Sequence, residues 1–446
     1  MRLRTSFVHK AAYSLVLGLV AATVTACGGS KRSAPGPSGL STRVFVTQSV
    51  AAPTARPGII VVNGFNDTLP SAAEIPAGAS PGLMAITSDR KTVLVLDAAT
   101  NNVSIINASK ESSLGSVAMP GPPGSPITSM VALASGAAFV PDPSAPVVGS
   151  PPGAVVAINL ATGNIFGTVS VPNAQTIVTN AQESQLLVFS NDSDSVTVLS
   201  PNLVDSSNQV TAVVAGFDRP VYAVFSSDGS TAYVVNCGLE CGGVQASVQL
   251  LNMTTTPPSL GAKVSVNGAT TALLQGSTLY VAGNGSPSGP LCASIANAAA
   301  TAAQHCGTLD LIDIGTLQDS YFNNPAVEIA IPDGYHNRID MSENGQLFIG
   351  SQGCTNVGDV NNPVGEVRGC LGIFNTSTAA VVIPPDNGDV TGLQNFSTRF
   401  AEYVVEGNRL RVYNTQLDSL LLNDFVTTGT IIYPGQFVDI KAVDFF

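Results

Sequence analysis

Few side chains of this protein could serve as general acids, general bases or nucleophiles near neutral pH. The 446 residues include three histidines, His9, His305 and His336. None of them lies in an H-E-x-x-H or C-x-x-C-H motif, and the chain has no G-x-S-x-G sequence and no glycine-rich phosphate loop. A histidine-rich metal centre is therefore excluded. We expect no metal and no cofactor, and an enzymatic activity is less favoured than a binding role.

Four titratable side chains stand near the start of two β-rich runs. Asp218 and Arg219 precede the run PVYAVF, and His336 and Arg338 are assigned to the same place in a later run. Lys and Arg total only 18, so arginines placed in this way could bind an anionic or carbonyl-bearing ligand. The alternative is structural: Arg219 pairs with Asp218, and Arg338 pairs with Asp340, to bridge neighbouring segments.

Two acidic segments are possible Ca²⁺ sites. Asn191, Asp192 and Asp194 lie in NDSDS, and Asp359 and Glu366 lie in GDVNNPVGE. Neither segment has the spacing of a dedicated calcium loop. We interpret both as polar turns.

Six cysteines follow Cys27 and fall into three sequential pairs. Each pair lies inside one unit of the sequence repeat described below, between the second and third β-runs, which favours local disulfides. A metal site is the alternative, but Cys-x₃-Cys without a nearby His is a poor match to zinc spacing. The predicted bridges are Cys237–Cys241, Cys292–Cys306 and Cys354–Cys370.

The N-terminal residues 1–26 have the pattern of a secretory signal, with three basic residues, an apolar stretch and small residues before Cys27. Val24-Thr25-Ala26-Cys27 resembles a bacterial lipobox, which implies that Cys27 is lipidated. The alternative is an ordinary signal peptide with an incidental cysteine. Residues 27–42 are rich in Gly, Ser and Pro, as expected of a flexible tether. We therefore expect a membrane partner through the lipid, in the cell envelope, with the outer membrane favoured.

The composition narrows the class of protein. Hydrophobic residues form 44% of the chain and charged residues only 11%, while Gly (43) and Pro (29) are abundant. The formal net charge is -12, which repels polyphosphate, so nucleic-acid binding is not expected. These values are typical of a secreted, loop-rich β protein.

The elements that must position these residues recur along residues 43–446. Eight units each contain a β-run ending in a tetrad, a loop, and a further β-run that in seven units ends in Asn or Asp. Such short strands without amphipathic helices predict a single β-propeller domain. The tetrads are FVTQ, LVLD, FVPD, LVFS, YVVN, YVAG, FIGS and YVVE, and they begin at Phe45, Leu94, Phe139, Leu187, Tyr233, Tyr280, Phe348 and Tyr403.

The unit PVYAVFSSDGSTAYVVN resembles the YVTN repeat of bacterial β-propellers. The first unit lacks the run before its tetrad, and the chain ends in a β-like run without a tetrad. We therefore predict that residues 438–443 pair with the strand containing Phe45 and close an eight-bladed ring. Seven blades are the alternative, because the first unit is split and the eighth is degenerate.

The sequence predicts the cellular location and the fold of this protein better than its activity. The favoured function is a lipid-anchored propeller that binds a protein or polymer through its disulfide-bearing loop face. The YVTN resemblance implies an alternative, a lactonase-like enzyme, because some propellers of similar repeat type are lactonases. Such an enzyme would use Asp218, Arg219, His336 and Arg338 at the channel mouth. A subunit that packs against other exported proteins cannot be separated from the first function by sequence.

Overall fold

The computed structural model divides the chain into residues 1–35 and 36–446, and all described residues lie in the second unit. They are residues 38–49, 57–69, 74–201, 210–285, 307–322, 324, 327, 329–354, 357–358, 367–384, 388–416, 419–422, 426–427, 430–431 and 436–444. The signal segment, Cys27 and most of the expected tether therefore lie outside the described residues. No helix within the described residues is long and apolar enough to cross a membrane.

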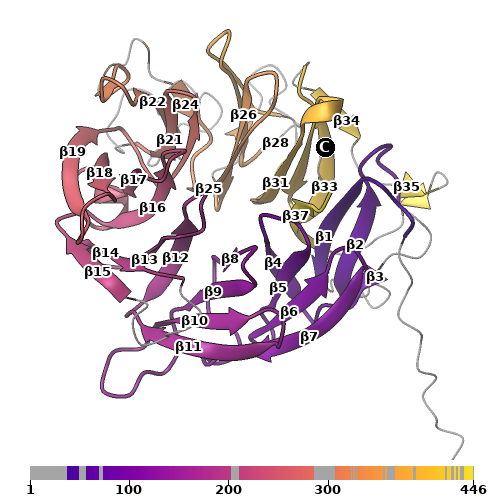
Figure 1. Cartoon of the computed structure of the whole chain (residues 1–446). Helices are drawn as coiled ribbons and strands as arrows, with labels where there is room; N and C mark the ends of the chain where they lie inside the picture. Colours follow the sequence, from indigo (N-terminus) through magenta and orange to yellow (C-terminus); the bar gives the residue numbers. More distant parts are fainter. Residues whose placement is uncertain are drawn as a thin grey trace, which may run out of the picture. The chain divides into compact units, whose positions relative to one another are not determined.

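Eight antiparallel sheets follow one another around a centre (Figure 1) and form an eight-bladed β-propeller, as predicted. The strands below run from the innermost to the outermost in each blade. Blade one contains β37 (Gln436–Ala442), β1 (Arg43–Ser49), β2 (Gly58–Asn63) and β3 (Glu74–Ile75). Blade two contains β4 (Pro81–Ile86), β5 (Thr92–Asp97), β6 (Asn102–Asn107) and β7 (Ser112–Ala118). Blade three contains β8 (Val131–Ala132), β9 (Ala137–Asp142), β10 (Ala154–Asn159) and β11 (Asn164–Ser170). Blade four contains β12 (Ala174–Thr179), β13 (Leu186–Ser190), β14 (Ser195–Leu199) and β15 (Val210–Ala215).

The second half of the ring has the same order. Blade five contains β16 (Pro220–Phe225), β17 (Thr231–Asn236), β18 (Ser247–Asn252) and β19 (Ser259–Ser265). Blade six contains β20 (Thr271–Gln275), β21 (Thr278–Asn284), β22 (Gly307–Asp313) and β23 (Gln318–Asp319), and β24 (Ile329–Ile331) also pairs with β22. Blade seven contains β25 (Tyr335–Met341), β26 (Gln346–Gln352), β29 (Leu371–Asn375) and β30 (Ala380–Val382). Blade eight contains β31 (Val390–Phe396), β32 (Ala401–Glu406), β33 (Arg409–Asn414) and β34 (Ser419–Leu422). Two short ribbons, β27 (Val357–Gly358) with β28 (Val367–Arg368) and β35 (Val426–Thr427) with β36 (Thr430–Ile431), extend from the last two blades.

The repeat tetrads lie in the second strand of each blade. Both faces of these strands pack against neighbouring blades. In β5, all residues after Thr92 are buried. Val93 and Val95 contact the cluster that contains Phe45 and Val61 of blade one. The apolar cores therefore lie between adjacent blades, and near-continuous apolar runs are favoured over alternating ones.

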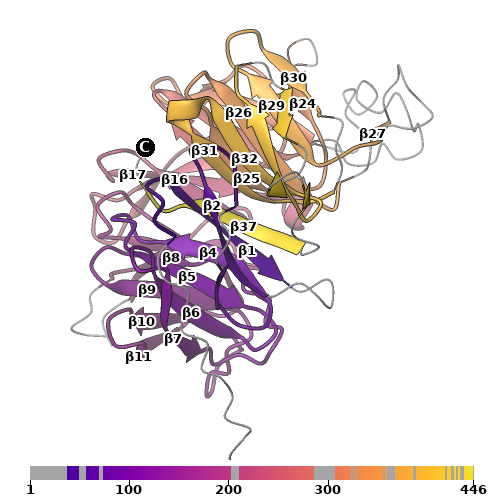
Figure 2. The ribbon, with the colours of Figure 1, turned by 90° about the vertical axis from the view of Figure 1, so that its right-hand side faces the viewer.

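The ring closes where the C-terminal strand meets the first blade. β37 pairs antiparallel with β1, so that Val46 lies opposite Ile440 and Phe45 opposite Lys441, and the two strands lie side by side in Figure 2. This confirms the predicted closure and the count of eight blades. Without β37, the inner edge of blade one would be unpaired.

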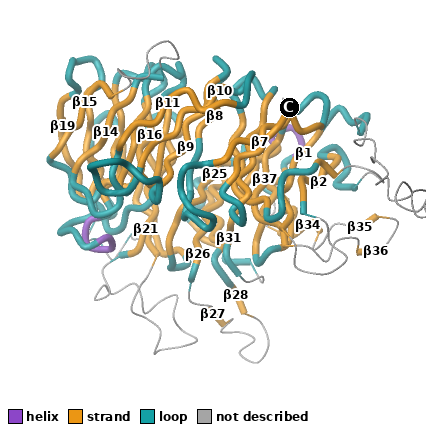
Figure 3. The backbone as a smooth tube through the Cα atoms, turned by 90° about the horizontal axis from the view of Figure 1, so that it is seen from below, coloured by secondary structure: helices purple, strands orange, loops and turns teal. Residues whose placement is uncertain are grey.

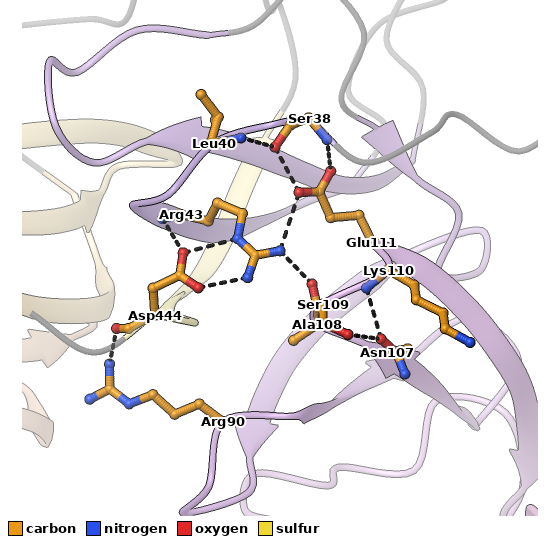
Figure 4. A network of polar contacts seen from close by, with 10 residues as sticks. All are labelled: Ser38, Leu40, Arg43, Arg90, Asn107, Ala108, Ser109, Lys110, Glu111 and Asp444. Atoms are coloured by element: carbon orange, nitrogen blue, oxygen red, sulfur yellow. Dashed lines mark hydrogen bonds and ion pairs between the residues drawn. The ribbon is translucent and has the colours of Figure 1, made fainter.

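An ionic network fixes this closure (Figure 4). The Arg43 guanidinium donates two bonds to Asp444, from Nε (2.9 Å) and Nη2 (2.6 Å), and contacts Glu111 of blade two at 3.3 Å. Arg90 donates to the Asp444 carbonyl. Ser38 donates its hydroxyl (2.6 Å) and its amide (2.5 Å) to Glu111. The first described residues and the last strand are therefore joined to the same neighbouring blade.

The blades present two different faces. Successive hairpins of an antiparallel sheet lie at opposite ends of the sheet. The connections between second and third strands, and between blades, therefore share one face, here called the loop face. Figure 3 shows the 3₁₀ turn η2 (Gly238–Cys241) and the β27–β28 ribbon on this side, with η3 (Ser397–Arg399) on the other. The opposite side, here called the turn face, carries the network of Arg43.

Candidate functional site

Two of the three predicted cysteine pairs are disulfide-bonded in the structure. Cys237 is joined to Cys241 with an S–S distance of 1.97 Å, and Cys354 to Cys370 with 2.08 Å. Cys292 and Cys306 lie outside the described residues. Both described bridges close connections between second and third strands, so they lie on the loop face. Disulfides are typical of extracytoplasmic proteins.

The segment 237–246, here called the Cys237 loop, is held tightly by its own blade. The Asp218 carboxylate accepts bonds from the amides of Val244 (3.0 Å) and Gln245 (2.8 Å). The amides of Cys237 and Gly238 donate to the carbonyls of Arg219 and Asp218, at 2.9 and 3.2 Å. Asp218 therefore positions this loop, and the Cys237–Cys241 bridge restrains it a second time.

The next blade also contacts the Cys237 loop. Glu240 accepts bonds from the amide (3.0 Å) and the side chain (2.9 Å) of Asn284, the last residue of β21 in blade six. The loop thus joins blades five and six on the loop face.

Large apolar side chains are exposed on this fixed backbone. Leu239 is 59% exposed and Val244 is 82% exposed. Tyr335, the first residue of β25 in blade seven, is 44% exposed at the same face. Apolar groups gathered on a restrained loop are typical of a binding surface, because binding then costs little conformational entropy. The sequence identified this loop through its cysteines, but it gave no signal that Leu239 and Val244 would be exposed.

The four side chains predicted to form one ligand site have separate surroundings. Asp218 bonds to the Cys237 loop, as described above. Arg219 lies 3.9 Å from Asp194 of blade four, and its amide donates to the same carboxylate at 3.2 Å. His336 is 1% exposed, its Nε2 lies 2.8 Å from the Pro332 carbonyl oxygen, and burial lowers its pKa to about 4.

Arg338 and Arg219 lie at different positions relative to the inner strands of their blades. Tyr222 pairs with Val235 in blade five, and Arg338 pairs with Gly350 in blade seven. Counted from the start of each tetrad, Val235 and Gly350 are equivalent, so Arg338 corresponds to Tyr222. The prediction that Arg219 and Arg338 hold equivalent places is therefore wrong. The β-bulges between Pro220 and Tyr222 and between His336 and Arg338 are not visible in the sequence pattern.

The two arginines do not form the ion pairs that were predicted as the structural alternative. Arg219 pairs with Asp194 and not with Asp218, and Arg338 donates to the carbonyl oxygen of Thr391 in blade eight (2.7 Å) and not to Asp340. Both arginines therefore bridge neighbouring blades, as the structural alternative expected.

A cavity of about 680 Å³ lies between the inner strands, and Arg338 is the one member of the predicted set that lines it. Its walls come from β37, β4, β12, β16, β25 and the segment 128–131 that includes the start of β8. Charged lining residues among those described are Arg338, Lys441 and Asp439. The sequence could not show that Lys441 of the closing strand lies beside this cavity.

The acidic segments give no metal site within the described residues. Asp194 contacts Arg219, and no cluster of three or more His, Cys, Asp or Glu side chains in the described ranges could hold an ion. Asp359 and Glu366 lie outside the described residues.

Comparisons with known proteins support the fold. No family model and no curated protein match the chain. A putative 6-phosphogluconolactonase of Bacteroides fragilis is 12% identical with a TM-score of 0.52, over 91% of this chain and 98% of that chain. The periplasmic gluconolactonase of Pseudomonas aeruginosa is 11% identical with a TM-score of 0.50, over 90% and 98%.

A dihydro-heme d1 dehydrogenase is 10% identical to this protein with a TM-score of 0.57, over 91% of this chain and 75% of that chain. At such low identity these similarities show the propeller architecture, and one architecture supports many unrelated activities.

Proposed function

We propose that this protein is a lipid-anchored, extracytoplasmic propeller of the YVTN-repeat type that binds a partner protein through its loop face. The single observation that carries this proposal is the exposure of Leu239 and Val244 on a backbone fixed by a disulfide and by Asp218. A rigid loop that presents apolar side chains suits a protein partner, whose own apolar groups can cover them.

The proposed anchor leaves the loop face free. Ser38 bonds to Glu111 in the turn between β6 and β7, so the chain enters the ring on the turn face. A lipid on Cys27 would hold the turn face toward the membrane through the short Gly/Ser/Pro tether. The Cys237 loop would then point away from the membrane, toward a partner.

The lactonase-like alternative has less support. It requires a carboxylate, an arginine and a histidine that converge on one substrate. His336 is buried against Pro332, Asp218 holds the Cys237 loop, and Arg219 pairs with Asp194. We therefore propose no catalytic role for these four residues.

Photo-crosslinking in intact bacterial cells tests the proposal. A photoreactive amino acid at position 239 should give one discrete protein adduct, because this side chain lies in the proposed interface. The matched control is position 114 on the outer strand β7, where Leu114 is 56% exposed; it should not give that adduct. The adduct formed from position 335 should be lost in Leu239→Asp/Val244→Asp. Equal labelling from positions 239 and 114, or an adduct from position 335 that survives both substitutions, would refute the loop as a binding surface.

A further inference from the structure

Arg338 has an unusual place in this acidic protein, because it lines the central cavity without a carboxylate partner among the described residues. Its Nε donates to the Thr391 carbonyl oxygen at 2.7 Å, and its Nη1 donates to the carbonyl oxygen of Asn337 at 3.0 Å. Both acceptors are neutral, so they orient the guanidinium without cancelling its charge. A guanidinium has five N–H donors, and donors therefore remain for a molecule in the cavity.

A second donor group comes from blade five. Tyr222 occupies the register position equivalent to that of Arg338 and lines the same cavity. Burial raises the pKa of Tyr222, and the nearby positive charge of Arg338 opposes this rise. The phenol is thus protonated at neutral pH, and its hydroxyl has no hydrogen-bond partner within the described part of the chain. It can donate to a bound acceptor.

The other two charged residues that line the cavity, Lys441 and Asp439, balance each other. Lys441 Nζ lies 3.3 Å from Asp439 Oδ1. Asp439 is also saturated by backbone donors, since it accepts bonds from the amides of Met84 and Ile440, both at 2.8 Å. Among the described residues that line the cavity, Arg338 is therefore the one charged side chain without an oppositely charged partner, in a protein whose formal charge is -12.

The size and walls of the cavity indicate the class of ligand. A volume of about 680 Å³ falls within the range of roughly 300–1,000 Å³ that is usual for small-molecule sites. Apolar residues, among them Leu83, Met130, Ile177 and Phe225, also line it. An inorganic anion would leave most of this space and these side chains without contact.

We propose that the central cavity binds a small organic carboxylate, with the carboxylate held by Arg338 and Tyr222 and the apolar body packed against Leu83, Met130 and Ile177. This site is separate from the Cys237 loop and does not depend on the function proposed for it. Arginine suits the role because its planar donors match the geometry of a carboxylate.

Saturation-transfer NMR with three probes of equal length, hexanoate, hexan-1-ol and hexylammonium, tests the proposal on the folded protein. Hexanoate should bind at millimolar concentration, and the neutral and cationic probes should bind much more weakly. Arg338→Gln should weaken hexanoate binding about tenfold or more, because a charged hydrogen-bond partner is lost. Tyr222→Phe should weaken it by about threefold. Arg219→Gln, an arginine outside the cavity, is the matched control and should bind hexanoate as the wild type does.

Arg338 also bridges blades seven and eight, so the fold of each variant is checked by circular dichroism and melting temperature. If Arg338→Gln unfolds, Tyr222→Phe and Arg338→Lys replace it in the test; Arg338→Lys should also weaken hexanoate binding, because lysine keeps the charge but lacks the planar donors that match a carboxylate. Absence of hexanoate binding, equal binding of hexanol and hexanoate, or folded Arg338 and Tyr222 variants with wild-type affinity would overturn the proposal. Loss of binding in Leu239→Asp/Val244→Asp would contradict the separation of the two sites.

Discussion

Replacing His336 by glutamine should remove an acid-sensitive part of the stability of blade seven. The imidazole is 1% exposed, Nε2 lies 2.8 Å from the Pro332 carbonyl oxygen, and Nδ1 has no partner among the described residues. A proton on Nδ1 would thus create a buried charge with no acceptor. This burial lowers the pKa of His336 to about 4. Glutamine keeps one N–H donor but cannot take up a proton.

The sign and size of the effect follow from linkage. The unfolded chain, with a histidine pKa of about 6.5, binds a proton more readily than the folded chain does. The stability that neutral His336 contributes is therefore complete above this pKa and declines as the pH falls toward 4, the folded pKa. Between pH 7 and pH 5 the loss amounts to about 2 kcal/mol.

Urea unfolding at several pH values, followed by far-ultraviolet circular dichroism, measures this effect. The free energy of unfolding of the wild type should fall by about 2 kcal/mol more than that of His336→Gln between pH 7 and pH 5. Burial also raises the pKa values of Glu402 and Asp340, but these groups are common to both proteins and cancel in the difference. Parallel curves for the two proteins would refute a buried neutral imidazole at this position.

Three further predictions concern the ends of the chain and the bridges. Cys27→Ala should abolish fatty-acid labelling and release soluble protein from the membrane fraction; unchanged labelling would contradict the anchor. Deletion of residues 436–446 should cause aggregation or proteolysis of the whole ring, because it exposes the inner edge of blade one; unchanged melting of a monomeric truncated protein would contradict this role of β37. Reduction should destabilise the loop face by about 2–3 kcal/mol per bridge but leave the ring folded, and non-reducing peptide mapping should also find Cys292–Cys306. Free thiols, or a pair such as Cys241–Cys292, would refute local pairing.

The blade count and the closure were predictable because the residues that specify them are buried. The tetrads and the third runs are buried on both faces, so their apolar character marks every blade. The unpaired C-terminal run and the split first unit favoured closure of an eight-bladed ring by the C-terminal strand over a seven-bladed alternative, and the pairing of Phe45 with Lys441 confirms this closure. The outer strands were missed: in β7 the residues from Ser113 to Ser116 are exposed, so no apolar pattern marks that strand.

Side-chain partners were decided by the tertiary structure. Arg219 and Asp218 are neighbours in sequence, yet Arg219 lies near Asp194 of the preceding blade, while Asp218 accepts amides from the Cys237 loop. Arg338 and Tyr222 line one cavity because bulges in β25 and β16 change the register of both strands.

The physical reason for this division lies in the range of the interactions. Burial of a strand depends on its own residue types and repeats with each blade, so the chain records it locally. Contacts across the cavity depend on how the eight sheets are placed around the ring. Lys441 and Arg338 lie about a hundred residues apart in the sequence, and only closure of the ring by β37 puts both in the wall of one cavity.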